Sequence, residues 1–322
     1  MDAVVIEQVT KTFGKTRAVD ELSLKVPGGT VYGFIGPNGS GKSTTLRMIM
    51  RILHPDSGRI QVLGKDATSG TGASDRVGYL PEERGLYRKM KVYDLLRFYA
   101  ELKSTKVNNA AIDDWLTRLK LPGVGSKPVE ALSKGMSQKI QFLSTVLHEP
   151  DLLILDEPFS GLDPVNMDVV RDAILEQKRR GATIIFSTHD MEVAEKMCDF
   201  IFMIYKGRKV LDGTLASIKE KYGRDTLRVR VEGNGMKFEE LPGVDRVTDF
   251  GQLQELRLNQ GSDPQSVLEA LVQRSRVQHF EIASPTLHDI FVRIAGPEAA
   301  EEVSDGSIQS TAIGAAQGVS RE

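Results

Sequence analysis

Residues 36–44 read GPNGSGKST, a glycine-rich run with the spacing of a phosphate-binding loop. This run constrains the fold, because such a loop joins the end of a buried strand to the start of a helix. Apolar residues 30–35 precede the loop, and residues 42–53 have the apolar periodicity of a helix. A chance match in a chain of this length has a probability of roughly 1%, which disfavours an ordinary glycine-rich turn. The pattern therefore predicts an α/β fold with a phosphate site.

Each residue type in the loop has a chemical reason. Glycines permit a tight turn whose backbone N–H groups converge on phosphate oxygens at the positive end of the helix. Lys42 would place a positive charge on the terminal phosphates, and the Ser43 hydroxyl would bind Mg²⁺. Thr44 already belongs to the helix. The candidate cofactor-binding residues of the loop, which would contact phosphates, are Gly36, Pro37, Asn38, Gly39, Ser40, Gly41, Lys42, Ser43 and Thr44.

Two adjacent carboxylates follow a second apolar run. Residues 152–155 (LLIL) have the pattern of a buried parallel strand, and Asp156 and Glu157 come directly after it. Asp156 suits the coordination of Mg²⁺. Glu157 suits a catalytic role, accepting a proton from the attacking water or orienting it. The alternative is that both residues only begin a capped helix before Pro158, and the phosphate loop upstream favours the functional interpretation.

Residues 132–138 (LSKGMSQ) resemble the signature motif of ABC-transporter ATP-binding subunits. The resemblance covers about residues 4–222, and includes residues 160–163 (SGLD), similar to the D-loop of this family. In that family two ATPase domains meet head to tail, so the resemblance implies that Ser133 and Gly135 contact the nucleotide of a second copy. Ser133 also precedes a helical stretch, where a simple capping role is the alternative.

Two further site residues are implied by the same resemblance. His189, within residues 187–190 (STHD), is similar to the switch histidine, which would bridge the γ-phosphate and the opposite subunit. Phe13 resembles the aromatic residue that stacks on adenine, and a turn-flanking aromatic that covers the sheet edge is an equally good interpretation.

The chain departs from the family pattern at three positions. Lys134 replaces the first glycine of the signature, and Met136 replaces its glutamine. Glu82 stands where most members have the Q-loop glutamine. A glutamate still suits Mg²⁺, but it donates no hydrogen bond unless it is protonated. Residues 80–87 (LPEERGLY) resemble a segment of some exporter branches, so the change is interpreted as a subfamily mark.

Composition limits the classes that remain. A chain of 322 residues with 40% hydrophobic residues predicts one large and one small domain. A net charge of −2 argues against a nucleic-acid partner. With Cys198 as the single cysteine, no disulfide or zinc cluster is expected within the chain, which fits a reducing compartment. No run of eighteen apolar residues occurs and the first residues do not resemble a signal peptide, so we do not expect the chain to cross a membrane. The transport role that the resemblance implies would place it in the cytoplasm, peripheral on the inner face of the membrane.

The expected fold is a P-loop NTPase of the ABC ATPase class in residues 1–222, with a mixed sheet core and a helical subdomain at about 88–148. Residues 223–295 predict a small α+β domain in the order strand, strand, helix, strand, helix, with Ser284 and Pro285 opening the last helix. It resembles the C-terminal domain of some exporter ATPases and carries no assigned role. Small and polar residues from 296 to 322 predict a disordered tail.

The resemblance implies an ATP-hydrolysing subunit that uses ATP and Mg²⁺ and drives translocation, most readily export, through a separate permease subunit. Closure of a dimer on ATP would be the mechanical step, and the intact motif set favours a homodimer. Two alternatives remain open. One is an ABC ATPase outside transport, although such members usually carry two cassettes, long coiled coils or a basic stripe. The other is a slowly hydrolysing regulatory protein, which Lys134 and Glu82 leave possible.

Overall fold

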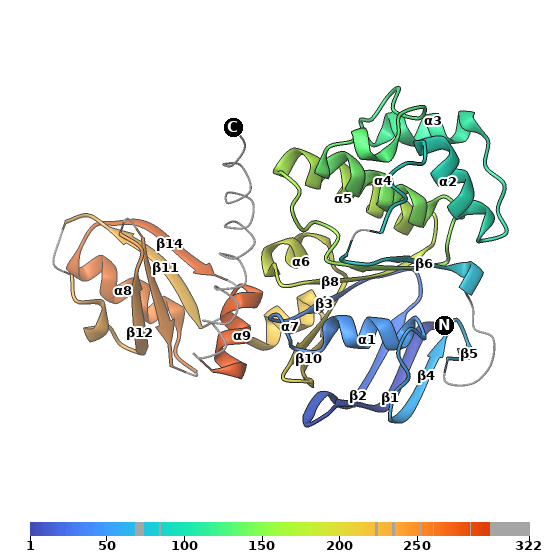
Figure 1. The fold of residues 1–322 in the computed structure, drawn as a ribbon. Helices are drawn as coiled ribbons and strands as arrows, with labels where there is room; N and C mark the ends of the chain where they lie inside the picture. The colour runs from blue at the N-terminus through green and yellow to red at the C-terminus, as the bar shows by residue number, and fades with distance from the viewer. Residues whose placement is uncertain are drawn as a thin grey trace, which may run out of the picture. The chain divides into compact units, whose positions relative to one another are not determined.

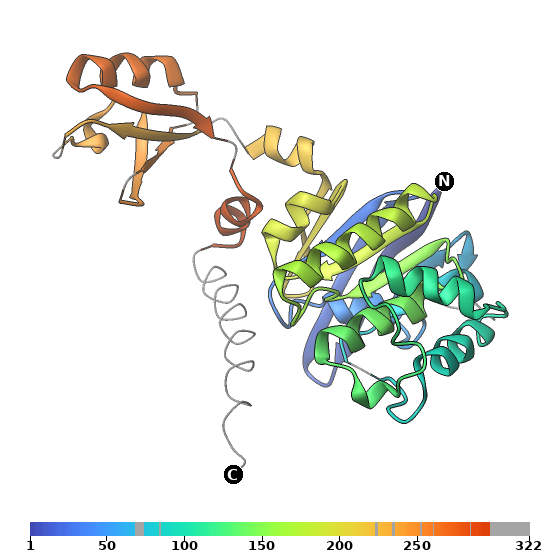
Figure 2. The ribbon, with the colours of Figure 1, turned by 90° about the horizontal axis from the view of Figure 1, so that it is seen from above.

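The computed structural model describes residues 1–67, 74–83, 85–222, 225–233, 236–251, 253–259, 261–283 and 285–296. They form two units, Met1–Gly213 and Thr214–Ile294 (Figures 1 and 2). Helix α7 (Leu215–Tyr222) belongs to the second unit, whereas the sequence analysis places the domain boundary after it. The carbonyl of Tyr222 accepts a 2.9 Å hydrogen bond from Arg293 in α9 (Leu287–Ala295), which ties the end of α7 to that unit.

The centre of the first unit is a sheet with the strand order β10-β9-β3-β8-β7-β6. Its strands are β3 (Val31–Ile35), β6 (Val77–Leu80), β7 (Leu152–Asp156), β8 (Thr183–Thr188), β9 (Phe200–Tyr205) and β10 (Arg208–Thr214). Within this sheet β9, β3, β8, β7 and β6 run parallel to one another. β3, β7 and β8 are buried at every position. Continuous apolar runs are the pattern of such strands, because both faces of the sheet are covered.

A second, antiparallel sheet has the order β2-β1-β4-β5. Its strands are β1 (Asp2–Phe13), β2 (Thr16–Pro27), β4 (Ser57–Val62) and β5 (Lys65–Asp66). Helix α1 (Lys42–Ile49) packs between the two sheets, and one apolar core joins Ile6 of β1, Phe34 of β3 and Leu46 of α1 (Figure 1). The mixed-sheet core is therefore confirmed.

Helix α1 is shorter than predicted. The sequence analysis extends it to residue 53, whereas the helix ends at Ile49. Arg51 adopts φ 60°, a left-handed conformation that a right-handed helix does not contain, so the chain turns at this point.

Three helices form the expected subdomain beside the central sheet, drawn in green in Figure 1. They are α2 (Val92–Glu101), α3 (Asn109–Arg118) and α4 (Lys134–Val146), with a 3₁₀ turn (Val129–Ala131) before α4. Apolar residues at helical spacing in α2 are buried, including Val92, Leu95 and Leu96. Two further helices, α5 (Pro164–Arg179) and α6 (Met191–Met197), follow β7 and β8, and a 3₁₀ turn (Ser74–Arg76) precedes β6.

The second unit is built on an antiparallel sheet with the order β12-β13-β11-β14. Its elements after α7 are β11 (Thr226–Val231), a 3₁₀ turn (Phe238–Glu240), β12 (Val244–Asp249), β13 (Gln254–Leu258), α8 (Pro264–Arg274), β14 (Val277–Ala283) and α9. Leu227 and Leu256 from the sheet pack against Val267 and Leu271 of α8. The α+β character is confirmed.

The predicted order of this unit is wrong in one element, because it omits β12. This strand lies at the sheet edge and none of its residues is fully buried. Its apolar residues Val244 and Val247 are three apart, which breaks the alternation that identifies a strand. Ser284 and residues 297–322, which carry the predicted helix opening and tail, lie outside the described residues. Within the described ranges, no helix is both long and apolar enough to cross a membrane.

Candidate functional site

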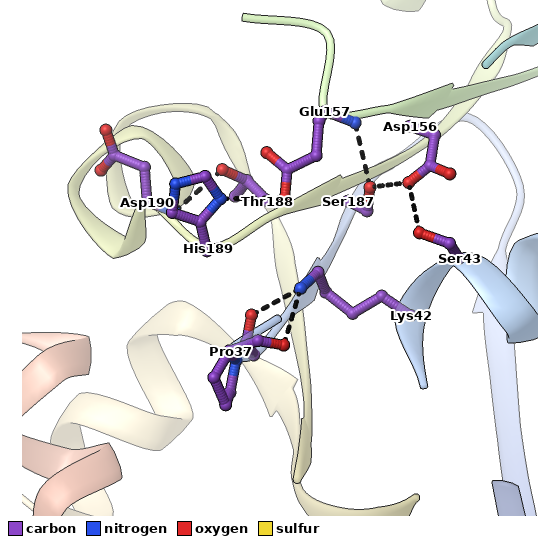
Figure 3. Close-up of polar contacts among 10 residues, drawn as sticks. Pro37, Lys42, Ser43, Asp156, Glu157, Ser187, Thr188, His189 and Asp190 are labelled. Carbon is purple, nitrogen blue, oxygen red and sulfur yellow. Dashed lines mark hydrogen bonds and ion pairs between the residues drawn. The ribbon is translucent and has the colours of Figure 1, made fainter. Parts of the chain in front are cut away.

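The parallel register of the central sheet brings the predicted residues together. Asp156 at the end of β7 pairs with Ser187 in β8, and Ile35 at the end of β3 pairs with Thr188. The loop after β3 therefore meets the carboxyl ends of β7 and β8, as Figure 3 shows for Lys42, Asp156 and Glu157. In open parallel sheets this edge is where ligands bind.

The phosphate loop is held by close backbone packing. A Cβ on Gly36 would lie 2.2 Å from the carbonyl oxygen of Ile204, and one on Gly41 would lie 2.5 Å from that of Ala18. Gly41 also has φ 110° and immediately precedes α1. Both positions therefore require glycine. The Ser40 hydroxyl within the loop is buried and has no hydrogen-bond partner among the described residues, which is the state expected of a group that awaits a polar ligand.

Lys42 lies directly above this loop. Its Nζ donates hydrogen bonds of 2.6 Å to the Gly36 carbonyl and 3.0 Å to the Pro37 carbonyl, and the residue is 5% exposed (Figure 3). Burial lowers the pKa of Lys42, while the carboxylates of Glu157, Asp156 and Glu82 act in the opposite direction. A positive charge in this position suits the binding of an anionic group.

Asp156 has one oxygen that is fully engaged and one that is free. The Ser43 hydroxyl donates to Oδ1 at 3.1 Å, and the Ser187 hydroxyl donates to the same oxygen at 2.5 Å. Asp156 Oδ2 is buried and has no partner among the described residues. A buried, unpaired carboxylate oxygen beside a serine hydroxyl matches the all-oxygen ligand preference of Mg²⁺. The residues present therefore fit this ion.

Glu157 follows in a strained backbone conformation, with φ 49°. A left-handed conformation at a residue other than glycine costs on the order of 1–3 kcal/mol and tends to occur at functional sites. The backbone N–H of Glu157 donates to Ser187 Oγ at 3.0 Å. Its Oε1 lies 3.0 Å from Nδ1 of His189, and this hydrogen bond is the main cause of a raised His189 pKa, against the effect of burial.

Glu82 belongs to the same electrostatic site. Partial desolvation is the largest cause of its raised pKa, followed by the negative charges of Asp156 and Glu157, while Lys42 lowers it. The structure thus places Glu82 close enough to these carboxylates for their charges to interact.

Three predicted residues lie apart from this cluster. Ser133 is exposed and caps α4, where its Oγ accepts a 3.2 Å hydrogen bond from the Met136 N–H. Gly135 follows in the first turn. Phe13 ends β1, is 48% exposed, and has the Lys11 ammonium 5.6 Å from its ring centre. The hydrogen bond of Ser133 and the ring contact of Phe13 are thus made within their own elements and not with the phosphate loop.

Two residues in the site had no predicted role. Ser187 joins Asp156 to the Glu157 backbone, and Gln138 in α4 donates a 2.7 Å hydrogen bond to the Pro158 carbonyl. Ser187 belongs to the segment that resembles the switch-histidine loop. Its contact with Asp156 could have been predicted if the pairing of β7 with β8 had been known.

Comparisons with known proteins agree with this arrangement. Residues 19–160 match the family model of ABC transporters, and residues 213–295 match the C-terminal domain of DrrA1-3-like ATP-binding proteins. An uncharacterised ABC transporter ATP-binding protein, YhaQ of Bacillus subtilis, is 39% identical over 91% of this chain and 98% of its own length. The Nod factor export ATP-binding protein I of Burkholderia lata is 32% identical over 90% of this chain and 96% of its own length.

A solved structure of an ATP-binding subunit of an ABC transporter has a similar fold. It aligns with a TM-score of 0.62 and 29% identity, covering 68% of this chain and 93% of its own.

Proposed function

Because the chain belongs to the ATP-binding subunits of ABC transporters, which are ATPases, we propose that it powers export by closing as a homodimer around two ATP molecules. The observation that carries this proposal is that one chain brings together only part of a complete site. The loop, Asp156, Glu157 and His189 cluster at one sheet edge, while Ser133 and Gly135 stand at the exposed start of α4.

A second copy would complete each site. The start of α4 presents the positive end of a helix, which suits a phosphate that is already bound to the loop of another chain. Ser133, whose Oγ accepts the Met136 N–H as a helix cap, would add a hydroxyl group to the shared site. Closure would be driven by the higher affinity of ATP for the closed dimer than for the open one.

Within one chain, the residues have distinct roles. The backbone of the loop and Lys42 would hold the phosphates, and Ser43 and Asp156 would hold Mg²⁺, with Glu82 nearby as a further candidate. The ion supplies charge neutralisation at the phosphates when it is bound. Glu157 would accept a proton from the attacking water or orient it, and His189 would hold the Glu157 carboxylate in place through the 3.0 Å contact.

The direction of transport is proposed from the relatives. The Nod factor export protein aligns along nearly its whole length, and the second unit matches a domain named for DrrA proteins. We therefore place the chain on the cytoplasmic face of the membrane, docked on a separate permease subunit.

Phe13 is kept as a candidate for stacking on the adenine, since its ring is exposed.

The test is ATP-dependent association of full-length Glu157→Gln protein, followed by light scattering with and without Mg²⁺. Loss of the carboxylate should block turnover but keep ATP bound, so a monomer-to-dimer shift is expected. Glu192→Gln is the matched control, because Glu192 is an exposed α6 carboxylate paired with Lys196; this variant should turn ATP over normally and accumulate no dimer. A protein that stays monomeric with ATP bound would contradict the homodimer.

Ser133→Ala in the Glu157→Gln background separates the shared site from a site within one chain. The double variant should return to monomer while it still binds ATP, because the loop is intact. If Ser133→Ala removed all nucleotide binding, the shared-site proposal would be wrong.

A further inference from the structure

Ser187 has a fully buried side chain at the end of β8 and stands opposite Asp156 in the parallel β7–β8 pair. A serine hydroxyl has a single proton to donate. Ser187 gives that proton to Asp156 Oδ1 at 2.5 Å, and its oxygen accepts the backbone N–H of Glu157 at 3.0 Å. One hydroxyl thus contacts both residues of the acidic pair.

The consequence is an asymmetric carboxylate. Oδ1 of Asp156 receives two hydroxyl protons, from Ser43 and Ser187, whereas Oδ2 is buried and receives none among the described groups. Without the Ser187 bond, the carboxylate would be held by Ser43 alone and could rotate about its last bond. The Ser187 bond therefore selects the oxygen that is left unpaired.

We propose that Ser187 is a positioning residue for the metal site, which holds Asp156 with Oδ2 free for Mg²⁺ and holds the Glu157 backbone in its left-handed conformation. This inference rests on the proposed function, because it assigns Asp156 to Mg²⁺ and Glu157 to the water. Ser187 itself would touch neither the ion nor the nucleotide. Its effect would pass through the two residues that it contacts.

The geometry also explains why a hydroxyl is needed. The Glu157 N–H and the Asp156 oxygen both contact one atom, Ser187 Oγ, so the group at this position must accept one hydrogen bond and donate another (Figure 3). Alanine at this position would leave a buried N–H without its acceptor. Threonine would keep both hydrogen-bonding functions.

The experiment compares three variants of the full-length protein. Ser187→Ala removes the hydroxyl and Ser187→Thr keeps it. Thr183→Val is the matched control, because the Thr183 hydroxyl is also buried in β8 and also accepts a backbone N–H, that of Gly29 at 2.9 Å, but at the opposite end of the strand. The readouts are Mn²⁺ binding by electron paramagnetic resonance with ADP present, ADP affinity without metal, and the thermal unfolding midpoint.

We expect Ser187→Ala to raise the half-saturating Mn²⁺ concentration at least about tenfold, the usual effect of losing a group that orients a metal ligand. Metal-free ADP affinity should be unchanged, Ser187→Thr should restore Mn²⁺ binding, and Thr183→Val should leave it as in the wild type. Unchanged Mn²⁺ binding in Ser187→Ala would overturn the proposal. An equal loss of Mn²⁺ binding in Thr183→Val would also overturn it, because the effect would then be one of packing.

Failure of the proposed function gives a different result. A Glu157→Gln protein that binds ATP but stays monomeric would contradict the dimer, whereas the Mn²⁺ titration measures the site of a single chain and tests Ser187 independently.

Discussion

In the first unit, Lys42 at the start of α1 and Asp156 and Ser187 near the ends of β7 and β8 are buried, whereas the polar side chains of the second unit's sheet are mostly exposed or half-buried. Among the described residues of the second unit, Thr226 is the buried polar side chain, and its hydroxyl accepts a 3.0 Å hydrogen bond from Arg293. In the first unit, Asp156 Oδ2 and Ser40 Oγ are buried and have no hydrogen-bond partner among the residues that the structure describes.

This difference separates stability from function. A buried polar group without a hydrogen bond lowers the free energy of unfolding. The first unit therefore loses stability at this strand edge, but the same unpaired groups can form hydrogen bonds with a ligand. The second unit shows the opposite arrangement, with Arg293 bonded to Asp225, Thr226 and the Tyr222 carbonyl. Substitutions of the buried polar groups at this strand edge should therefore mainly affect ligand binding, and those in the second unit should mainly affect folding.

The largest expected effect is that of Lys42→Ala on nucleotide affinity. Removal of one partner from a buried charged contact costs about 2–5 kcal/mol, so we expect affinity to fall at least about 30-fold. The unfolding midpoint should change little, because the buried ammonium already costs desolvation. Titration with a fluorescent nucleotide and thermal unfolding measure the two quantities.

Lys178→Ala is the control for this prediction, since Lys178 pairs with Asp199 at 2.7 Å outside the site. It should bind nucleotide like the wild type. If Lys42→Ala retained wild-type nucleotide affinity, the claim that buried polar groups at this strand edge serve ligand binding would be wrong.

Arg293→Ala should show the reverse pattern. The Arg293 side chain is 15% exposed, and its loss removes the cation that pairs with Asp225 and the hydrogen bond that Thr226 Oγ1 accepts, so we expect a cost of about 2 kcal/mol. Hydrogen exchange of the β11 amides in the full chain should become faster, with nucleotide affinity unchanged. Arg246→Ala, at an exposed position in β12, is the control. Weakened nucleotide binding in Arg293→Ala would contradict the separation.

Thr286→Ala should destabilise the start of α9 by about 1 kcal/mol, the usual cost of losing a helix cap. The Thr286 hydroxyl accepts the Asp289 N–H at 3.1 Å, and Asp289 in return accepts the Thr286 N–H at 2.9 Å. Exchange of the first α9 amides measures the effect, and Thr248→Ala in β12 is an exposed control. Unchanged protection of α9 would show that the cap contributes nothing.

The smallest effect should be the pH dependence of the His189–Glu157 contact. The pKa of His189 is raised in the folded chain, so its contribution to stability is complete below the unfolded pKa near 6.5 and is lost as pH rises through the folded pKa. The difference in unfolding free energy between wild type and His189→Gln should shrink from pH 5.5 to pH 8.5, by less than about 1 kcal/mol because the pair is partly solvated. A difference that grows with pH would contradict the assigned cause.

The sequence predicted the strand, loop and helix that carry Lys42. The phosphate loop, Asp156 and Glu157 are each identified by a few consecutive residues, and the strand, loop and helix around Lys42 are adjacent in the chain. The contact of Ser187 with Asp156 could not be predicted in the same way, because it depends on β7 and β8 being neighbours in one register.

Marginal elements were missed for a different reason. β12 is stabilised by its pairing with β13 more than by its own apolar residues, so its pattern alone does not identify it. In α1, the helical periodicity continues past the point where Arg51 turns the backbone. Periodicity shows only which side chains are apolar. The pairing of β12 and the end of α1 depend instead on backbone hydrogen bonds and backbone conformation.

The Asp156–Ser187 pairing also limits which changes of length the gene can accept. Successive residues of a strand point to opposite faces, so one residue inserted within Thr183–Thr188 would turn the Ser187 side chain away from Asp156. The same insertion at Gly181, before the strand begins, would be absorbed by the turn and leave the register intact. Length variation among natural or engineered versions of this chain should therefore gather at the amino ends of the central strands and be absent from their last residues.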